Sequence, residues 1–432
     1  MSFDYDVFPK VFSLGSETTI SICARHDEFC GRFLDKRFKA GEVYHLSVFS
    51  KVEHSDKMDL SVKADKQGLL KFEMKFNTKG EYFIDIKKKD EEDNPLSEER
   101  IFVVEPEMMK LRPYKGDLHI HTSYTDGRKS PLQMAVKAKD YGMDFIAITD
   151  HDRYFPSLEA IDKAKKMKIN LLVFQGEEIS VQDSVGSGSH VVSLCASEHV
   201  KGKFSPDNPS AEEYDKEIKD IIDNDLKDKK LIKGLNKEKY SHLVWVIKKI
   251  RQFGGYVLLA HPYWEYPRGK YYLDRLVFDQ LIADGLFDFI EISINTDLSI
   301  AKCFSEVSRG KKIIPISTSD GHDYFPSSPR YGKYYTIVFA DKLEKKNIFK
   351  ALFESKCVAV GHHPGDYESL FGSFELVEYS DFLIREFFPL HDRTCHLESE
   401  LYMRVIEGEN KNNQMLDKLR KELVELYKKY WS

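Results

Sequence analysis

Histidine and carboxylate residues recur at short spacing in the middle of this 432-residue chain. Asp117, His119 and His121 alternate with apolar residues, and this spacing places all three side chains on one face of an extended strand. Imidazole and carboxylate groups are ligands of Zn, Mn and Fe, and a mixed set suits more than one of these ions. The triplet therefore indicates a site for divalent metal ions.

The same residue types return in five later groups, and this recurrence carries the prediction. One His-x-His pair is a weak signal, because it arises by chance in roughly half of chains with this His content. His190 has a second interpretation, as an ordinary strand residue before an apolar pair. The triplet is followed by Asp126, and the later groups are Asp150-His151-Asp152, Glu177-Glu178, His190, His261 and Asp320-Gly321-His322.

These groups need strands that bring them to one place, and the surrounding sequence predicts such strands. Short apolar segments alternate with amphipathic helical stretches, which is typical of parallel βα units with right-handed crossovers. Seven such strands favour an α/β barrel, where the carboxyl ends of the strands converge on the active-site mouth. The predicted strands are residues 116–121, 145–149, 171–174, 191–195, 256–260, 287–292 and 313–317.

The sequence on either side of this region predicts different structures. Up to about residue 105, alternation such as Leu70, Phe72 and Met74 predicts the half-buried strands of a small antiparallel β-sandwich. Beyond about residue 375, apolar residues at helical spacing predict helices that pack on the parent domain, with a dimer contact as the alternative. Residues 201–240 are rich in charge, and this segment is either a solvated helical excursion or a lid over the site.

Composition excludes several classes of function. The net charge of -6 argues against duplex nucleic-acid binding, which needs a basic face, but leaves room for a short oligonucleotide held at one phosphate. No window is apolar enough for a transmembrane helix, and the N-terminus lacks a secretory pattern. Six scattered Cys residues indicate free thiols in a reducing compartment, so we expect a cytoplasmic protein.

The motifs GDLHIHTSYTDG, AITDHD, GEEIS, AHP and SDGH resemble, in order, the signature of the PHP (polymerase and histidinol phosphatase) superfamily of metal-dependent phosphoesterases. The resemblance covers about residues 112–365. It implies a distorted seven-stranded (β/α) barrel with three metal ions. Together with the residue patterns on either side, this predicts a β-sandwich at 1–108, the barrel at 112–370 and a helical extension at 374–432. The implied ligands are His119, His121, Glu178 and Asp320 for one metal, Asp126, His151 and His322 for a second, and His190, His261 and the bridging Glu178 for a third.

The resemblance implies a hydrolase in which metal-activated water attacks a phosphate ester, with Mn, Fe or Zn as cofactor. The expected substrate is a small or nucleotide-like phosphate ester or a short oligonucleotide. Asp117 and Asp152 are expected to orient imidazoles, and His322 or Asp152 to serve as general acid. Arg153 is the first candidate to hold the phosphate, and the other candidates are Arg128, Arg268 and Arg330. Aromatic residues after His261 suggest either a stack for a nucleobase or packing at the rim.

Two other functions remain open at this point. An activated hydroxide is not restricted to phosphorus, so hydrolysis of a C–N or C–O bond is the second enzymatic interpretation. A non-catalytic metal-binding module is the third, although all nine expected ligand positions hold competent residues.

Overall fold

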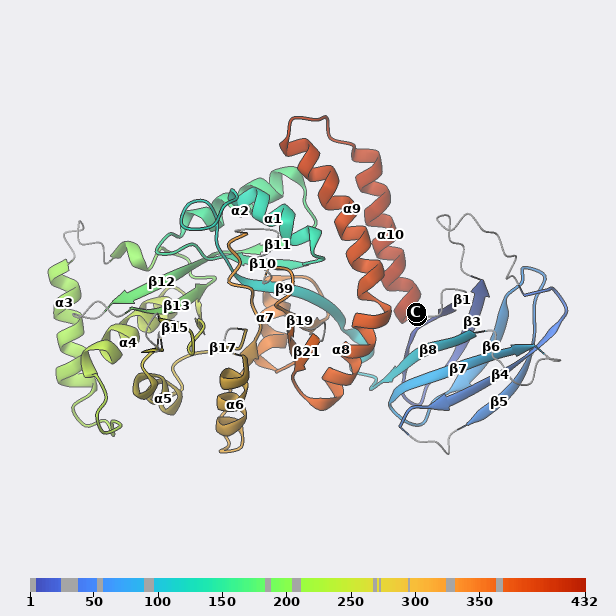
Figure 1. Cartoon of the computed structure of the whole chain (residues 1–432), viewed down its shortest axis with the longest axis horizontal. Coiled ribbons are helices and arrows are strands. Elements are labelled where there is room, and N and C mark those ends of the chain that lie inside the picture. Colours follow the sequence, from blue (N-terminus) through green and yellow to red (C-terminus); the bar gives the residue numbers. More distant parts are fainter. Residues whose placement is uncertain are drawn as a thin grey trace. The chain divides into compact units, whose positions relative to one another are not determined.

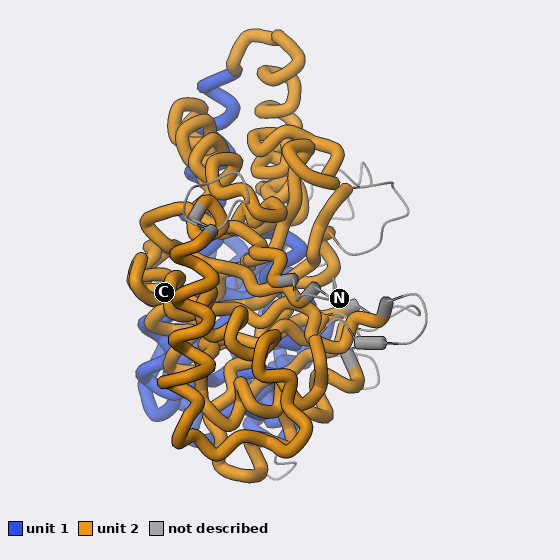
Figure 2. The backbone as a smooth tube through the Cα atoms, turned by 90° about the vertical axis from the view of Figure 1, so that its left-hand side faces the viewer, with its two compact units in different colours: residues 1–112, 373–394, 412–432 blue, residues 113–372, 395–411 orange. Residues whose placement is uncertain are grey.

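The computed structural model describes residues 5–24, 38–52, 57–88, 97–182, 188–203, 211–266, 270–271, 273–293, 296–323, 331–362 and 368–432. The chain divides into two compact units, coloured separately in Figure 2. Unit 1 contains residues 1–112, 373–394 and 412–432, and unit 2 contains residues 113–372 and 395–411. This division assigns parts of the C-terminal helices to each unit. The three domain boundaries expected from the sequence stay a prediction.

Unit 1 is built on two sheets that share a hydrophobic core. Its three-stranded sheet has the order β1-β3-β6, and its five-stranded sheet has the order β2-β8-β7-β4-β5. Ile20 and Leu70 of the first sheet and Leu46 and Ile84 of the second belong to one buried cluster, as the period-2 alternation requires. The strands are β1 (Tyr5–Phe8), β2 (Val11–Ser13), β3 (Glu17–Ala24), β4 (Val43–Ser50), β5 (Met58–Lys63), β6 (Leu70–Lys75), β7 (Gly80–Lys88) and β8 (Ser97–Val104).

The C-terminal helices complete unit 1. The ring of Phe102 on β8 lies 5.1 Å from Tyr379 on α8 (Phe374–Glu386). Arg385 on the same helix contacts Glu81 on β7 at 3.0 Å. The helix α10 (Asn413–Trp431) buries Leu416, Leu419 and Leu423 along one stripe, as its spacing predicts. The helix α9 (Phe388–Ile406) lies between them in sequence and contributes to both units.

Unit 2 is a mixed α/β structure with two larger sheets (Figure 1). Its six-stranded sheet has the order β11-β10-β9-β19-β20-β21, and its five-stranded sheet has the order β12-β13-β14-β17-β18. Parallel bridges join Ile120 to Gly321 and His151 to Glu178, so the two sheets meet at the residues that carry the predicted site. The strands are β9 (Arg112–Ile120), β10 (Phe145–Ile148), β11 (Leu172–Phe174), β12 (Gly176–Gln182), β13 (Gly188–Leu194), β14 (Tyr256–Leu259), β15 (Glu265–Tyr266), β16 (Lys270–Tyr271), β17 (Phe289–Glu291), β18 (Pro315–Ile316), β19 (Tyr335–Ala340), β20 (Cys357–His362) and β21 (Glu368–Phe371).

The prediction of parallel pairing throughout was wrong in the middle of the five-stranded sheet. Strand β12 pairs with β13, and β13 with β14, in antiparallel register. Only five residues separate Gln182 from Gly188, which is too short for the crossover that a parallel pair needs. The strands β9, β10 and β11 and the strands β14, β17 and β18 are parallel as expected.

Helices cover unit 2, and their ends follow local sequence rules. Helix α1 begins with a capping box made by Ser130 and Gln133, and α5 is capped by Asp274 and ends at Gly285 in the left-handed conformation. Helix α4 packs on β12, β13 and β14. The helices are α1 (Pro131–Asp140), α2 (Phe155–Met167), α3 (Ala211–Asp220), α4 (Lys237–Gln252), α5 (Arg275–Asp284), α6 (Thr296–Val307) and α7 (Lys345–Phe353).

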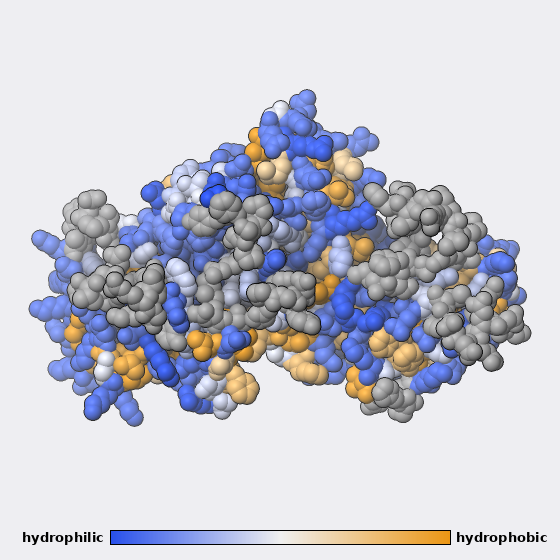
Figure 3. Space-filling model, viewed as in Figure 1, coloured by the Kyte–Doolittle hydropathy of each residue, from blue (hydrophilic) through white to orange (hydrophobic). Residues whose placement is uncertain are grey.

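The surface is mostly polar on the face shown in Figure 3, where hydrophobic residues form separate small patches. Within the part of the chain that the structure describes, no helix combines the length and apolar character needed to cross a membrane.

Candidate metal centre

The first pair of histidines comes from β9 and confirms the face predicted by their spacing. His119 and His121 are fully buried, and their Nε2 atoms lie 3.1 Å apart. Asp117 holds the end of this strand, because its carboxylate accepts hydrogen bonds from the backbone N–H of His119 at 3.2 Å and of Ser319 at 3.0 Å. The Asp117 carboxylate also accepts a hydrogen bond from the Ser319 hydroxyl, and the expectation that it orients an imidazole ring stays a prediction.

Glu178 on β12 lies at the centre of the cluster. Its Oε2 atom lies 3.2 Å from His119 Nε2, 3.1 Å from His121 Nε2 and 3.1 Å from His151 Nδ1. Its Oε1 atom lies 2.7 Å from His190 Nδ1 and 3.0 Å from the Nε2 atom of the fifth histidine, His261. One fully buried carboxylate thus contacts five imidazoles from β9, β13 and the segments after β10 and β14.

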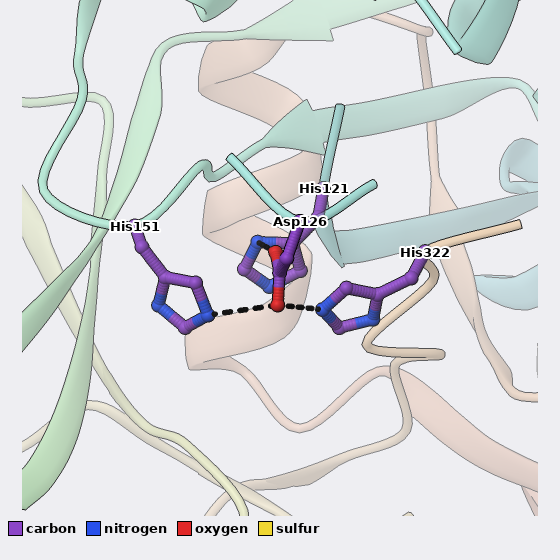
Figure 4. A group of neighbouring side chains, drawn as sticks. All are labelled: His121, Asp126, His151 and His322. Carbon is purple, nitrogen blue, oxygen red and sulfur yellow. Dashed lines mark hydrogen bonds and ion pairs between the residues drawn. The ribbon is translucent and has the colours of Figure 1, made fainter. Parts of the chain in front are cut away.

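Asp126 joins the more exposed histidines (Figure 4). Its carboxylate lies between the rings of His151 and His322, with Oδ2 at 3.6 Å and 3.0 Å from their Nε2 atoms. His121 lies behind it, with Nδ1 at 3.6 Å from Asp126 Oδ1. Asp320 completes the inner group at 3.1 Å from His121 Nε2.

Backbone strain concentrates around this cluster. Asp152, His261, Asp320 and Asp323 all have positive φ angles, of 52°, 25°, 49° and 51°. Residues other than glycine adopt this conformation only when the surrounding structure enforces it, and such residues gather at functional sites. All four are cluster residues or direct neighbours of one in sequence.

Charges inside the cluster shift the pKa values strongly. Burial would lower the pKa of His121, but hydrogen bonds to Asp320 and Glu178 outweigh it and raise that pKa to about 9. Burial would raise the pKa of Glu178, yet the charges of His190 and His119 hold it well below its usual range. The site therefore consists of carboxylates surrounded by imidazoles. This arrangement attracts protons or cations.

The donor set fits metal ions better than protons. The Nδ1 atom of His121 is buried, and no described residue forms a hydrogen bond with it. The imidazole and carboxylate ligand atoms instead converge within the cluster. Three groups have their ligand atoms within 4.8 Å of one another: His119, His121, Glu178 and Asp320; His121, Asp126, His151 and His322; and His151, Glu178 and His190.

The structure brings all nine predicted metal-ligating residues into this one cluster. The groups overlap more than the implied ligand sets do, since His121 and His151 each belong to two groups. Asp152 accepts a hydrogen bond from the backbone N–H of Ser180 at 2.8 Å and so holds β12 beside the cluster. Arg153 is exposed, and within the described residues its side chain makes no hydrogen bond or ion pair with the cluster. Arg268 and Arg330, two further phosphate-binding candidates, lie outside the described residues.

Sequence reasoning missed Glu291 at the end of β17. This fully buried carboxylate accepts a hydrogen bond from the backbone N–H of His261 at 2.5 Å and lies 3.5 Å from His119 Nδ1. The Thr318 hydroxyl also donates to it. An acidic residue between the apolar residues Ile290 and Ile292 was the available signal, because a buried charge needs a partner.

The fold and the site define a mixed α/β protein with a cluster of metal-ligating side chains where its strands end. Residues 117–304 match the family model of the PHP domain. This part of the chain is therefore a PHP domain, and the resemblance seen in the sequence motifs is confirmed. Asp320 and His322 of the cluster lie beyond the matched residues.

Two curated relatives share short segments with this chain. A 5'-3' exoribonuclease of Haemophilus influenzae is 38% identical over 80 residues, which are 18% of this chain and 28% of that protein. The DNA polymerase/3'-5' exonuclease PolX of Bacillus subtilis is 42% identical over 48 residues, which are 11% of this chain and 8% of that protein. The chain thus spans less than a third of either relative.

Two solved structures share part of the fold at low similarity. A two-domain protein from Bacteroides vulgatus, containing a predicted PHP-like metal-dependent phosphoesterase, is 19% identical with a TM-score of 0.40, covering 59% of this chain and 66% of that chain. An amidohydrolase from Chromobacterium violaceum with bound sulfate is 18% identical with a TM-score of 0.31, covering 48% of this chain and 87% of that chain.

Proposed function

We propose that this protein is a metal-dependent phosphoesterase that hydrolyses a small or nucleotide-like phosphate ester at a centre of three divalent metal ions. The observation that carries the proposal is the overlap of three ligand groups. Two of them contain Glu178, which shares its two oxygens among five imidazoles. A PHP domain supports this chemistry. The two curated relatives are named as nucleases, and this supports a phosphate ester as the substrate.

Bound divalent ions at such a site would lower the pKa of a water molecule and neutralise charge on the phosphate. The residues of this chain do the remaining work. Glu178 and the buried His119 and His121 hold the inner side of the site and exclude bulk water from it. Asp126 and His151 form the outer side, where a phosphate group enters.

Protonation of the leaving oxygen needs an acid at the outer side. His322 can take this role only where its Nε2 atom, which faces Asp126 at 3.0 Å, is not a metal ligand, because its Nδ1 atom already lies 2.7 Å from the backbone oxygen of Asp320. Asp152 is the alternative acid, although its carboxylate is engaged by Ser180 and lies 3.5 Å from Lys201. Arg153 is the proposed phosphate-binding cation.

The proposal includes the finer architecture expected from the family. The two bridged sheets of unit 2 support a distorted seven-stranded barrel, and the two sheets of unit 1 around a shared core support a β-sandwich.

Metal analysis of the parent protein and of His119→Ala, followed by an ester panel, tests this function. We expect two to three equivalents of Mn, Fe or Zn in the parent and a clear loss in the variant. The panel pairs phosphomonoesters and phosphodiesters with carboxyl esters and amides. Hydrolysis of amides alone would move the function to a C–N hydrolase. Less than half an equivalent of metal, not restored by adding metal, would reject the catalytic proposal.

A further inference from the structure

The metal cluster is closed on one side and open on the other. His119, His121 and Glu178 are fully buried. By contrast, the side chains of Asp126 and His151 are 44% and 27% exposed. A substrate phosphate therefore reaches the cluster past Asp126 and His151. The group attached to that phosphate then lies against the residues next to these two.

Two exposed aromatic residues flank Asp126 and His151 in sequence. Tyr124 lies two residues before Asp126, and Phe155 lies four residues after His151, as the first residue of α2. The two rings contact each other in a T-shaped arrangement, with centroids 4.7 Å apart and planes at 78°. Two segments that each supply a cluster residue thus also supply one ring of a shared aromatic pair.

The pair is held in place although it faces solvent. Tyr124 is 38% exposed and Phe155 is 45% exposed. The Tyr124 hydroxyl donates a hydrogen bond to Glu159 on α2 at 2.7 Å, which ties the loop to the helix that carries Phe155. In a T-shaped pair the edge of one ring meets a single face of the other, so each ring keeps a face outside the contact.

Two other aromatic residues close to the cluster in sequence, Tyr154 and Tyr263, are buried for packing, whereas Trp264 is 41% exposed and lies 5.3 Å from the ring of the buried His261. Tyr154 is 9% exposed, and its hydroxyl donates to the backbone oxygen of Ala196 at 2.8 Å. Tyr263, two residues after His261, belongs to the hydrophobic core beneath α4 and α5. Packing therefore accounts for Tyr154 and Tyr263 but not for the exposed pair, and exposed apolar surface beside a polar site is typical of ligand contact.

We propose that Tyr124 and Phe155 form a stacking subsite for a planar aromatic group attached to the substrate phosphate, namely the base of a nucleotide. This inference rests on the proposed phosphoesterase function and names the substrate class of the same site. Stacking on an aromatic side chain is tolerant of base identity, because every base has a flat face. The subsite predicts a preference for nucleotides over sugar phosphates, with little discrimination among the four bases.

The test compares two substrates that differ only in the base. Adenosine 5'-monophosphate and ribose 5-phosphate are assayed with the full chain loaded with Mn²⁺. In Phe155→Ala we expect KM for adenosine 5'-monophosphate to rise about tenfold, with ribose 5-phosphate little changed. Phe155→Leu keeps apolar volume but loses the flat ring and should behave in the same way. Tyr124→Phe keeps the ring without the bond to Glu159 and should retain most of the preference.

Phe304→Ala is the matched control, because Phe304 is 70% exposed on α6, a helix that supplies no cluster residue. Equal effects of Phe155→Ala on both substrates, or none on either, would overturn the subsite while leaving phosphoesterase activity in place. If the parent hydrolyses neither compound, the proposed function fails for them, and calorimetric binding of the same pair decides the subsite. Tighter binding of the nucleotide that is lost in Phe155→Ala supports it, and equal binding of the two compounds rejects it.

Discussion

Replacing Glu291 by glutamine should weaken metal binding without removing any predicted ligand. Glu291 lies behind two of the cluster histidines: its carboxylate is 3.5 Å from His119 Nδ1 and accepts the backbone N–H of His261 at 2.5 Å. On the other side of its ring, His119 presents Nε2 to Glu178 at 3.2 Å. A carboxylate on the distal nitrogen fixes the orientation of an imidazole and makes it a stronger ligand.

The glutamine keeps the shape of the side chain and removes its negative charge. Loss of such a partner weakens metal affinity about 10- to 100-fold, or about 1.4 to 2.7 kcal/mol. Competition with a chromophoric chelator measures this affinity in the parent protein and in Glu291→Gln, and thermal melting of the metal-free proteins checks that both fold.

Glu177→Gln is the matched control. Glu177, on β12, is a fully buried carboxylate like Glu291. It accepts a hydrogen bond from the backbone N–H of Val200 at 2.6 Å and points away from the cluster. This variant should keep the metal affinity of the parent. Unchanged affinity in Glu291→Gln, or an equal loss in Glu177→Gln, would refute the assignment of Glu291 as a residue that positions His119.

Three further predictions follow from the site. In the metal-free protein the raised pKa of His121, about 9, stabilises the fold fully below about pH 6.5 and less as pH rises towards 9, so the Tm should fall over this interval. Added Mn²⁺ should reverse the trend, because imidazoles bind metal when deprotonated, and a Tm independent of pH would contradict this. Trp264 lies 5.3 Å from the His261 ring, so metal binding should change its fluorescence, and Trp264→Phe should abolish the signal. Arg153→Ala should raise KM or lower kcat on a phosphate ester with metal content intact, and unchanged kinetics would discard its role.

Local sequence patterns predicted much of the secondary structure, because the spacing of apolar residues sets which face of a strand or helix is buried. The period-2 alternation of residues 116–121 placed His119 and His121 on one face, and the structure shows their Nε2 atoms in contact distance. The same alternation predicted the two-sheet core of unit 1. The stripe of Leu416, Leu419 and Leu423 predicted the buried side of α10.

Such patterns could not predict the direction in which strands pair or the partners of polar side chains. An apolar segment has the same sequence pattern in parallel and antiparallel sheets. The antiparallel pairing of β12 with β13 was therefore missed. Asp117 is adjacent to the histidines in sequence, and its contacts with the backbone N–H groups of His119 and Ser319 were not predicted. Glu291 belongs to the site although no motif marks it, because its partners come from β9 and the segment after β14.

The sequence by itself determined the residue types of the metal centre, since imidazole and carboxylate chemistry follows from composition and spacing alone. Tertiary structure decided which carboxylate is central and which side of the cluster is open. These features depend on contacts between segments up to about two hundred positions apart, such as Asp126 with His322. No local period encodes a distance of that kind, because it is set by how the two sheets of unit 2 meet.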